Sequence, residues 1–181
     1  LANNYFLCTF GLYFRKSIFM DTTTSFLQSM PFEELKKQVL EDYQIAVLSR
    51  ECSLAGRREV LTGKAKFGIF GDGKEVPQLA MARAFQRGDF RSGYYRDQTF
   101  MLAIGELTPK QFFAGIYADN NIEHEPHSGG RQMGGHFATH SLDADGNWVK
   151  LTEQYNTASD VSCTAGQIPR LVGLAQASKI Y

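Results

Sequence analysis

The chain has 181 residues, of which 43% are apolar and 21% are charged, and its formal net charge is zero. This length and composition suit one folded domain with a hydrophobic core and exclude a disordered chain. The zero net charge argues against nucleic acid as a partner, because a surface that follows a phosphate backbone leaves an excess of basic residues. The 3 cysteines are too few for a disulfide framework, which favours a reducing compartment.

The first part of the chain differs from the rest. Residues 5–14 are apolar but too short to span a bilayer, and Arg15 and Lys16 follow this run, whereas a secretory signal carries its charges in front. We expect residues 1–19 to be upstream sequence that is not native, with a peripheral membrane anchor as the alternative. Residues 1–29 are then a leader, disordered or non-native, and residues 30–181 form the folded part, with no membrane partner.

A long amphipathic helix is predicted after the leader. Ser29 is placed to cap it, Pro31 lies in its first turn, and the helical pattern ends before Gly63. The apolar residues that recur at helical spacing, and that we expect to face the core, are Phe32, Leu35, Val39, Leu40, Tyr43, Ala46, Val47 and Leu54.

Three shorter helices and one long loop are predicted further along. The helices cover residues 77–85, begin at Thr108-Pro109, and begin again after Gly166. Residues 119–147 hold all 4 histidines and form a loop that we expect to be mobile because few contacts hold it. No series of strands is evident.

Two segments, residues 93–98 and 129–137, carry most of the chemical information. The first contains Arg96, and the second contains Arg131 between glycines, followed by His136. Arginine offers five donors in a planar fork that suits phosphate or carboxylate, and glycine lets backbone approach a ligand closely. Together they predict a site for an anionic cofactor or substrate, built from distant segments.

Two further sequence patterns suggest a functional site but also have a simpler structural interpretation. Gly71-Asp72-Gly73 suits a metal or phosphate site, but we interpret it as a tight turn, which Asp favours. Four histidines could form a zinc site, although Pro126 breaks the helical register that a metalloprotease motif needs. These are His124, His127, His136 and His140.

Considered together, residues 32–178 resemble the alpha subunit of the thiamin-diphosphate-dependent 2-oxo acid dehydrogenases. The resemblance is most specific at three places, with the branched-chain type the nearest: Tyr95-Arg96-Asp97, Gly130-Arg131-Gln132-Met133 with His136, and Gln167-Ile168-Pro169. It implies an α/β, thiamin-diphosphate-binding fold, truncated here, with a mainly helical N-terminal part. It also implies a cytoplasmic protein, or a mitochondrial matrix protein in a eukaryote.

The resemblance assigns roles to five residues. Tyr95 and Arg96 match a pair beside the cofactor, with the arginine on its diphosphate. Ser162 and Thr164 match residues that contact its rings, and His136 matches a catalytic loop histidine at the entrance. Thr164 stands where the family has a bulky aliphatic residue, and the family's potassium loop is altered in this sequence.

The implied activity is oxidative decarboxylation of a 2-oxo acid with acyl transfer to lipoyl groups. Its cofactors are thiamin diphosphate and Mg²⁺, whose ligands are expected beyond Tyr181, so no metal-binding residue is assigned here. The implied partners are a beta subunit, or beta half of the same chain, and a lipoyl acyltransferase. We expect this N-terminal fragment to be inactive alone. Two alternatives stay open: a non-catalytic helical partner-binding module, and a zinc-dependent hydrolase that uses the histidine loop.

Overall fold

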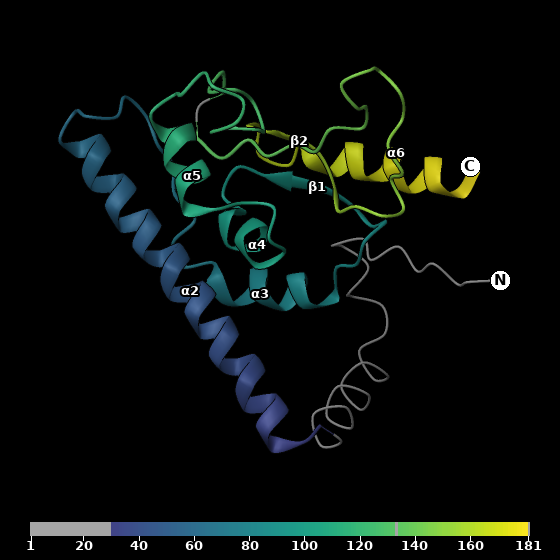
Figure 1. Cartoon of the computed structure of the whole chain (residues 1–181), viewed down its shortest axis with the longest axis horizontal. Coiled ribbons are helices and arrows are strands. Elements are labelled where there is room, and N and C mark those ends of the chain that lie inside the picture. Colours follow the sequence, from purple (N-terminus) through teal and green to yellow (C-terminus); the bar gives the residue numbers. More distant parts are fainter. Residues whose placement is uncertain (1–29, 133, 181) are drawn as a thin grey trace. The chain divides into compact units, whose positions relative to one another are not determined.

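The computed structural model describes residues 30–132 and 134–180 (Figure 1). The chain divides into two compact units, residues 1–44 and residues 45–181. The predicted leader and its capping Ser29 lie outside the described residues. Among the described residues, no helix is both long and apolar enough to cross a membrane.

The long helix α2 spans Phe32–Leu61, as predicted, but the face that it buries is not the predicted apolar one. Its buried residues are small: Ser49, Cys52, Ser53 and Gly56. The predicted core positions Val47 and Leu54 are 41% and 43% exposed. The reason is close packing, because a Cβ atom on Gly56 would lie 2.5 Å from the ring of Phe70. The small side chains on this face let neighbouring segments approach the α2 backbone closely, whereas large apolar side chains would keep those segments farther away.

The other predicted helices are confirmed, with one added. Helix α3 spans Glu75–Ala84, α5 spans Pro109–Ile116 and α6 spans Gln167–Ile180. Thr108 caps α5 through a full capping box with Gln111, with the proline in the first turn. Helix α4, Gln98–Ala103, was not predicted, because its 6 residues are too short to show a period.

Two strands, also not predicted, form a small parallel sheet. Strand β1, Phe90–Tyr94, pairs with β2, Asn156–Val161, with a register irregularity between Ser92 and Tyr94. The sequence does not reveal these strands because they are short and rich in polar residues, several of which are buried. The mixture of helices with a parallel sheet is compatible with the predicted α/β class.

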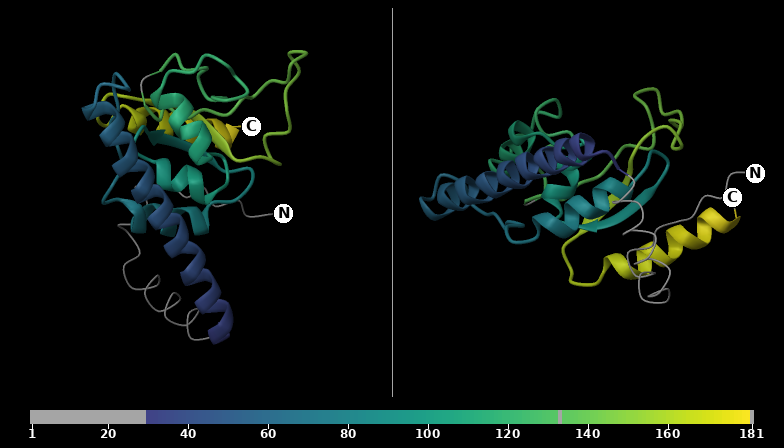
Figure 2. Two further views of the ribbon diagram at one scale, coloured as in Figure 1. Left: turned by 60° about the vertical axis from the view of Figure 1, so that its left-hand side comes forward. Right: turned by 90° about the horizontal axis from the view of Figure 1, so that it is seen from below.

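Helices flank the sheet of the second unit. Helix α3 packs against α4, and α6 packs against β1. Figures 1 and 2 place the α3–α4 pair and α6 on opposite sides of the sheet. A cluster of buried residues from α2, α4, α5 and the intervening loops forms the core: Cys52, Ala65, Phe100, Met101, Leu107, Phe112, Ile116 and Phe137.

The described residues of the 119–147 segment, which exclude residue 133, form no helix and no named strand, as predicted, but the premise that few contacts hold this segment is wrong. The Glu125 side chain is buried, and its carboxylate accepts hydrogen bonds from the backbone of His127, Ser128 and Gly130 at 2.9–3.1 Å. The Ser128 hydroxyl adds a fourth bond at 2.6 Å. Glu125 therefore organises the glycine-rich turn from inside.

Candidate functional site

The candidate site lies where the two parallel strands end. Strand β1 ends at Tyr94, directly before Tyr95 and Arg96, and β2 ends at Val161, shortly before Thr164. The carboxyl ends of parallel strands meet at one edge of a sheet, where α/β proteins commonly bind ligands. The topology thus brings together two segments that are about seventy residues apart in sequence.

Direct contacts join the predicted site residues at this edge. The Nε2 atom of His136 hydrogen-bonds to Oγ of Ser162 at 2.5 Å. The rings of Tyr95 and His136 lie with their centroids 5.8 Å apart. The hydroxyls of Tyr94 and Tyr95 lie 2.8 Å apart, and Thr164 interacts with Tyr94 and lowers its pKa. The structure therefore collects Tyr95, His136, Ser162 and Thr164 into one cluster.

Arg96 completes the cluster. Its Cζ atom lies 5.4 Å from the centroid of the Tyr95 ring, and its buried Nε has no hydrogen-bond partner among the described residues. Its carbonyl is fixed from the other side, since Gln78 Nε2 donates to it at 3.1 Å and a Cβ atom on Gly71 would lie 2.3 Å from it. A guanidinium with a fixed backbone and a spare donor is able to bind an anion.

An ion triad adjoins the cluster, with Arg91 and Asp160 buried and Asp97 half-buried. Nη2 of Arg91 donates to Asp97 at 2.7 Å and to Asp160 at 3.1 Å, and the Arg91 guanidinium lies over the Phe100 ring. Burial raises the pKa of Asp160 above its usual value, although Arg91 opposes the rise. The triad joins β1, the Tyr95-Arg96 turn and β2.

The paired tyrosine hydroxyls perturb each other. The hydrogen bond with Tyr95, and then that with Thr164, lowers the pKa of Tyr94. The same bond with Tyr94, together with partial burial, raises the pKa of Tyr95. Tyr94 is therefore the more acidic of the two groups, and Tyr95 holds its proton more firmly.

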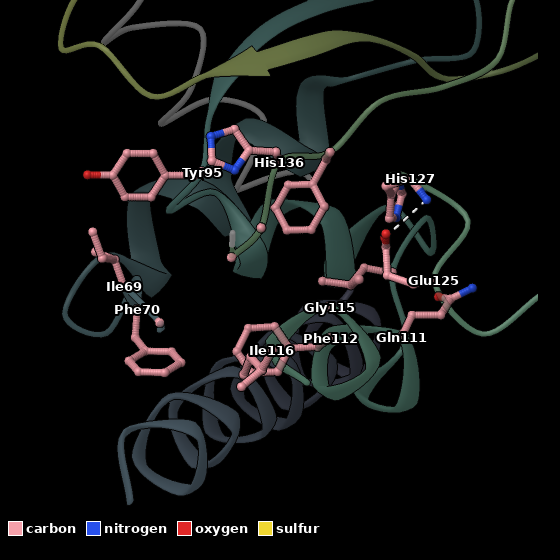
Figure 3. Close-up of a pocket in the computed structure, with 15 residues that line it drawn as sticks. Ile69, Phe70, Tyr95, Gln111, Phe112, Gly115, Ile116, Glu125, His127 and His136 are labelled. Carbon is pink, nitrogen blue, oxygen red and sulfur yellow. Dashed lines mark hydrogen bonds between the residues drawn. The ribbon is translucent and has the colours of Figure 1, made fainter. Parts of the chain in front are cut away.

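A pocket adjoins the cluster. Figure 3 shows Tyr95 and His136 on one side of it, with Phe112 and Ile116 on the opposite side. Glu125 and His127 line a third side, where His127 N donates to the Glu125 carboxylate. The Tyr95 and His136 side chains of the cluster therefore also line a small hollow with apolar and polar walls.

Other predicted features lie apart from this cluster. Arg131 is exposed and its guanidinium turns to its own loop, where Nη1 donates to the carbonyl of Ser128 at 3.4 Å. Asp72 lies in the predicted turn and pairs with Arg57 at 2.6 Å. The sequence expectation that Arg131 and Arg96 share one site is therefore not supported.

The histidines do not converge on one point. Nδ1 of His124 bonds to Asp119 at 2.8 Å, Nδ1 of His127 bonds to the carbonyl of Ala138 at 3.0 Å, and Nε2 of His140 bonds to the carbonyl of Pro126 at 3.2 Å. Within residues 30–132 and 134–180, no group of three His, Cys, Asp or Glu side chains is placed to hold a metal ion. The zinc alternative thus gains no support.

Comparison with known proteins shows a similarity to a dehydrogenase subunit. No protein-family model matches the chain. Over 120 residues, 66% of its length, the chain is 32% identical to the 2-oxoisovalerate dehydrogenase subunit alpha of Bacillus subtilis (strain 168). The match covers 31% of that protein, so the chain spans about a third of the length of the curated relative it matches. The similarity supports a relation to 2-oxo acid dehydrogenase alpha subunits.

The residues that support the site were missed in the sequence. Arg91, Asp160 and Glu125 are charged, and a charged residue is expected at the surface unless it is paired. One signal was available: a glycine inside a strand marks a close approach of another group, and Gly93 is such a residue. The partner of Arg91 at position 160 is 69 residues away, which no local pattern shows.

Proposed function

We propose that this chain forms part of the cofactor site of a thiamin-diphosphate-dependent 2-oxo acid dehydrogenase, as alpha-subunit sequence of the branched-chain type. The observation that carries the proposal is the convergence of Tyr95 and Arg96 with His136 and Ser162 at the carboxyl edge of the sheet. The identity with an alpha subunit of that class supports it independently.

The donor set fits the diphosphate of the cofactor. Arg96 has a buried Nε without a partner among the described residues, and the Tyr95 ring supports its guanidinium. Diphosphate oxygens are strong acceptors that match an arginine fork. Ser162 and Thr164 are exposed at the same edge and would contact the ring part of the cofactor.

Thiamin diphosphate, when bound, supplies the electron sink that decarboxylation of a 2-oxo acid requires. The residues of this chain would bind and orient it. His136 would act at the site entrance, where its Nε2 hydrogen-bonds to the Ser162 hydroxyl. The apolar side of the adjoining pocket, with Phe112 and Ile116, would exclude water from the charged edge.

The partners follow from the proposed class. A beta subunit or beta half would complete the site, and a lipoyl acyltransferase would accept the acyl group. Helix α6 supports the presence of a partner, because it leaves three apolar side chains 41–67% exposed: Ile168, Val172 and Ile180. Apolar surface of this kind is commonly covered by another chain.

Titration calorimetry tests the proposal with inorganic pyrophosphate on the chain, and with thiamin diphosphate and Mg²⁺ on the chain assembled with a beta subunit. A charge-assisted hydrogen bond is worth about 1.5–3 kcal/mol, or roughly one to two decades in affinity. Arg96→Ala should lower the affinity for both ligands by that factor, and Arg96→Lys should recover only part of the lost affinity. Arg57→Ala, which removes an exposed arginine paired with Asp72, is the matched control. Equal affinities in wild type and Arg96→Ala would remove Arg96 from the site, and no binding by wild type would overturn the proposal.

A further inference from the structure

We propose that Arg91 is the positioning residue of this site: one buried guanidinium nitrogen sets both the Tyr95-Arg96 turn and the His136 loop through two separate carboxylates. Arg91 lies on β1 and is only 6% exposed. Its Nη2 atom contacts Asp97 Oδ2 and Asp160 Oδ2. Each carboxylate leads to a different part of the site.

The first carboxylate holds the turn. Asp97 Oδ2 accepts from the backbone N–H of Tyr94 at 3.0 Å, and the backbone N–H of Asp97 donates to the Tyr94 carbonyl at 2.9 Å. These two bonds enclose Tyr95 and Arg96. Asp97 is also the N-cap residue of α4, yet its side chain makes no cap hydrogen bond. Aspartate is among the best N-cap residues, so the carboxylate gives up that stabilisation for Arg91 and Tyr94.

The second carboxylate holds the histidine loop. Asp160 Oδ2 accepts from the backbone N–H of Phe137 at 3.3 Å, and the backbone N–H of Asp160 donates to the Phe137 carbonyl at 3.0 Å. Phe137 directly follows His136, and Asp160 lies two residues before Ser162. The hydrogen bond between His136 and Ser162 is thus anchored at both ends by Asp160.

The space for the guanidinium is built into the strand. A Cβ atom on Gly93 would lie 1.9 Å from Cζ of Arg91, so any side chain there would displace the guanidinium. The glycine of the Gly-Tyr-Tyr-Arg-Asp segment therefore has a defined role. It admits the Arg91 side chain under the turn that carries Tyr95 and Arg96.

The triad uses one nitrogen rather than the arginine fork. Nη1 of Arg91 is buried without a hydrogen-bond partner among the described residues, and Nη2 makes both carboxylate contacts. A lysine ammonium is a point charge with three donors. It can bridge two carboxylates from one nitrogen, so Arg91→Lys should keep the positioning that Arg91→Met loses.

Nuclear magnetic resonance of the 181-residue chain tests this inference through the imidazole signals of His136. Arg91→Met and Asp160→Asn should shift the His136 signals, and Arg91→Lys should restore them. Asp97→Asn should shift them less than Asp160→Asn, because Asp97 acts on the other segment and reaches His136 only through the Tyr95 ring. Leu79→Ala is the stability control: it removes a buried side chain of α3 outside the triad and should leave His136 unchanged.

The ligand readout rests on the proposed function and uses inorganic pyrophosphate as the probe. Arg91→Met and Asp97→Asn should each lower the affinity for pyrophosphate by roughly tenfold, and Arg91→Lys should lower it less. If wild type does not bind pyrophosphate, the proposed function fails while the His136 signals still decide the role of Arg91. Native His136 signals in both Arg91→Met and Asp160→Asn would overturn the inference, as would the same displacement in Leu79→Ala. If Arg91→Met does not fold, Asp160→Asn and Arg91→Lys decide alone.

Discussion

His136 and Ser162 lie 26 residues apart in the chain, and their side chains meet in a hydrogen bond between Nε2 and Oγ. This contact links the glycine-rich loop to the segment that follows β2. It also means that the histidine is positioned by the sheet, because Ser162 comes directly after the last residue of β2. The position of the His136 side chain, although it lies in a loop, is therefore fixed by its bond to the residue that follows strand β2.

Ser162→Ala tests the consequence of that contact. The pair is at the surface, so loss of the bond should cost less than about 1 kcal/mol of the free energy of unfolding. The Nε2 nitrogen signal of His136 should nevertheless change, because its partner is gone. The signal of His124, which bonds to Asp119, should stay as in wild type. Ser178→Ala on α6 is the matched control, and equal His136 signals in both variants would contradict the assignment.

Gly71→Ala tests the close approach that fixes the backbone of Arg96. The added Cβ atom would lie 2.3 Å from the Arg96 carbonyl oxygen, so backbone must move. We expect a loss of about 1–3 kcal/mol in the free energy of unfolding, together with weaker pyrophosphate binding. Chemical denaturation and calorimetry measure the two effects.

The same substitution at Gly173 is the control for this test. Gly173 lies within α6 and a Cβ atom there would meet nothing within 4 Å. Gly173→Ala should therefore stabilise the chain by up to about 1 kcal/mol through helix propensity. Similar stabilities of the two variants would show that the approach of Gly71 to Arg96 is not tight.

The sequence indicates the helices better than the sheet, for a physical reason. Thr108-Pro109 and the residues after Gly166 carry local signals, a cap or a period, and the helices begin there. Strand β1 reads Phe-Arg-Ser-Gly-Tyr, with a buried arginine and a glycine. Its polarity is compatible with burial only because Asp97 and Asp160 pair with the arginine, and such pairing is a property of the fold.

The candidate site divides in the same way. Tyr95, Arg96, Ser162 and Thr164 were found through a family resemblance that covers most of the chain. Their proximity depends on two strands ending side by side, which periodicity did not show. The prediction of the buried face of α2 was wrong. The residues Ser49, Ser53 and Gly56 are buried because their small size permits close packing, and an apolar pattern does not identify them.

The ion pair between Arg50 and Glu75 predicts a pH dependence of stability. Arg50 donates to both carboxylate oxygens at 2.7 and 2.9 Å, and this lowers the pKa of Glu75 from 4.5 to about 2. A carboxyl whose pKa is lower in the folded state stabilises it above the unfolded pKa, and the stabilisation is lost as pH falls. The free energy of unfolding should therefore decrease between pH 4.5 and about pH 2.

Glu75→Gln isolates this contribution. The variant should show a smaller decrease than wild type across the same range, as measured by denaturant titration at each pH. Glu33→Gln is the matched control, because Glu33 is an exposed glutamate at the start of α2. Parallel curves for wild type and Glu75→Gln would show that the pair does not set the acid sensitivity.

Glu125 provides the last prediction, which concerns the order of the histidine loop. Burial raises the pKa of Glu125, but bonds from Ser128, Gly130 and His127 outweigh it and leave the pKa below its usual value. Both carboxylate oxygens are used, Oε1 by the His127 N–H and Oε2 by Ser128 and Gly130. A glutamine amide has only one acceptor oxygen, so Glu125→Gln must lose at least one side of this network.

Hydrogen exchange at residues 127–130 measures the effect. A buried group left unsatisfied costs about 1–3 kcal/mol, which is roughly one to two decades of protection. Glu125→Gln should lose that protection, whereas Glu123→Gln, an exposed glutamate in the same loop, should keep it. The wild-type loop should also lose protection as pH falls through the lowered pKa of Glu125, because the carboxylate that accepts the bonds is then protonated. Equal protection of residues 127–130 in the two variants would show that the Glu125 carboxylate does not order this loop.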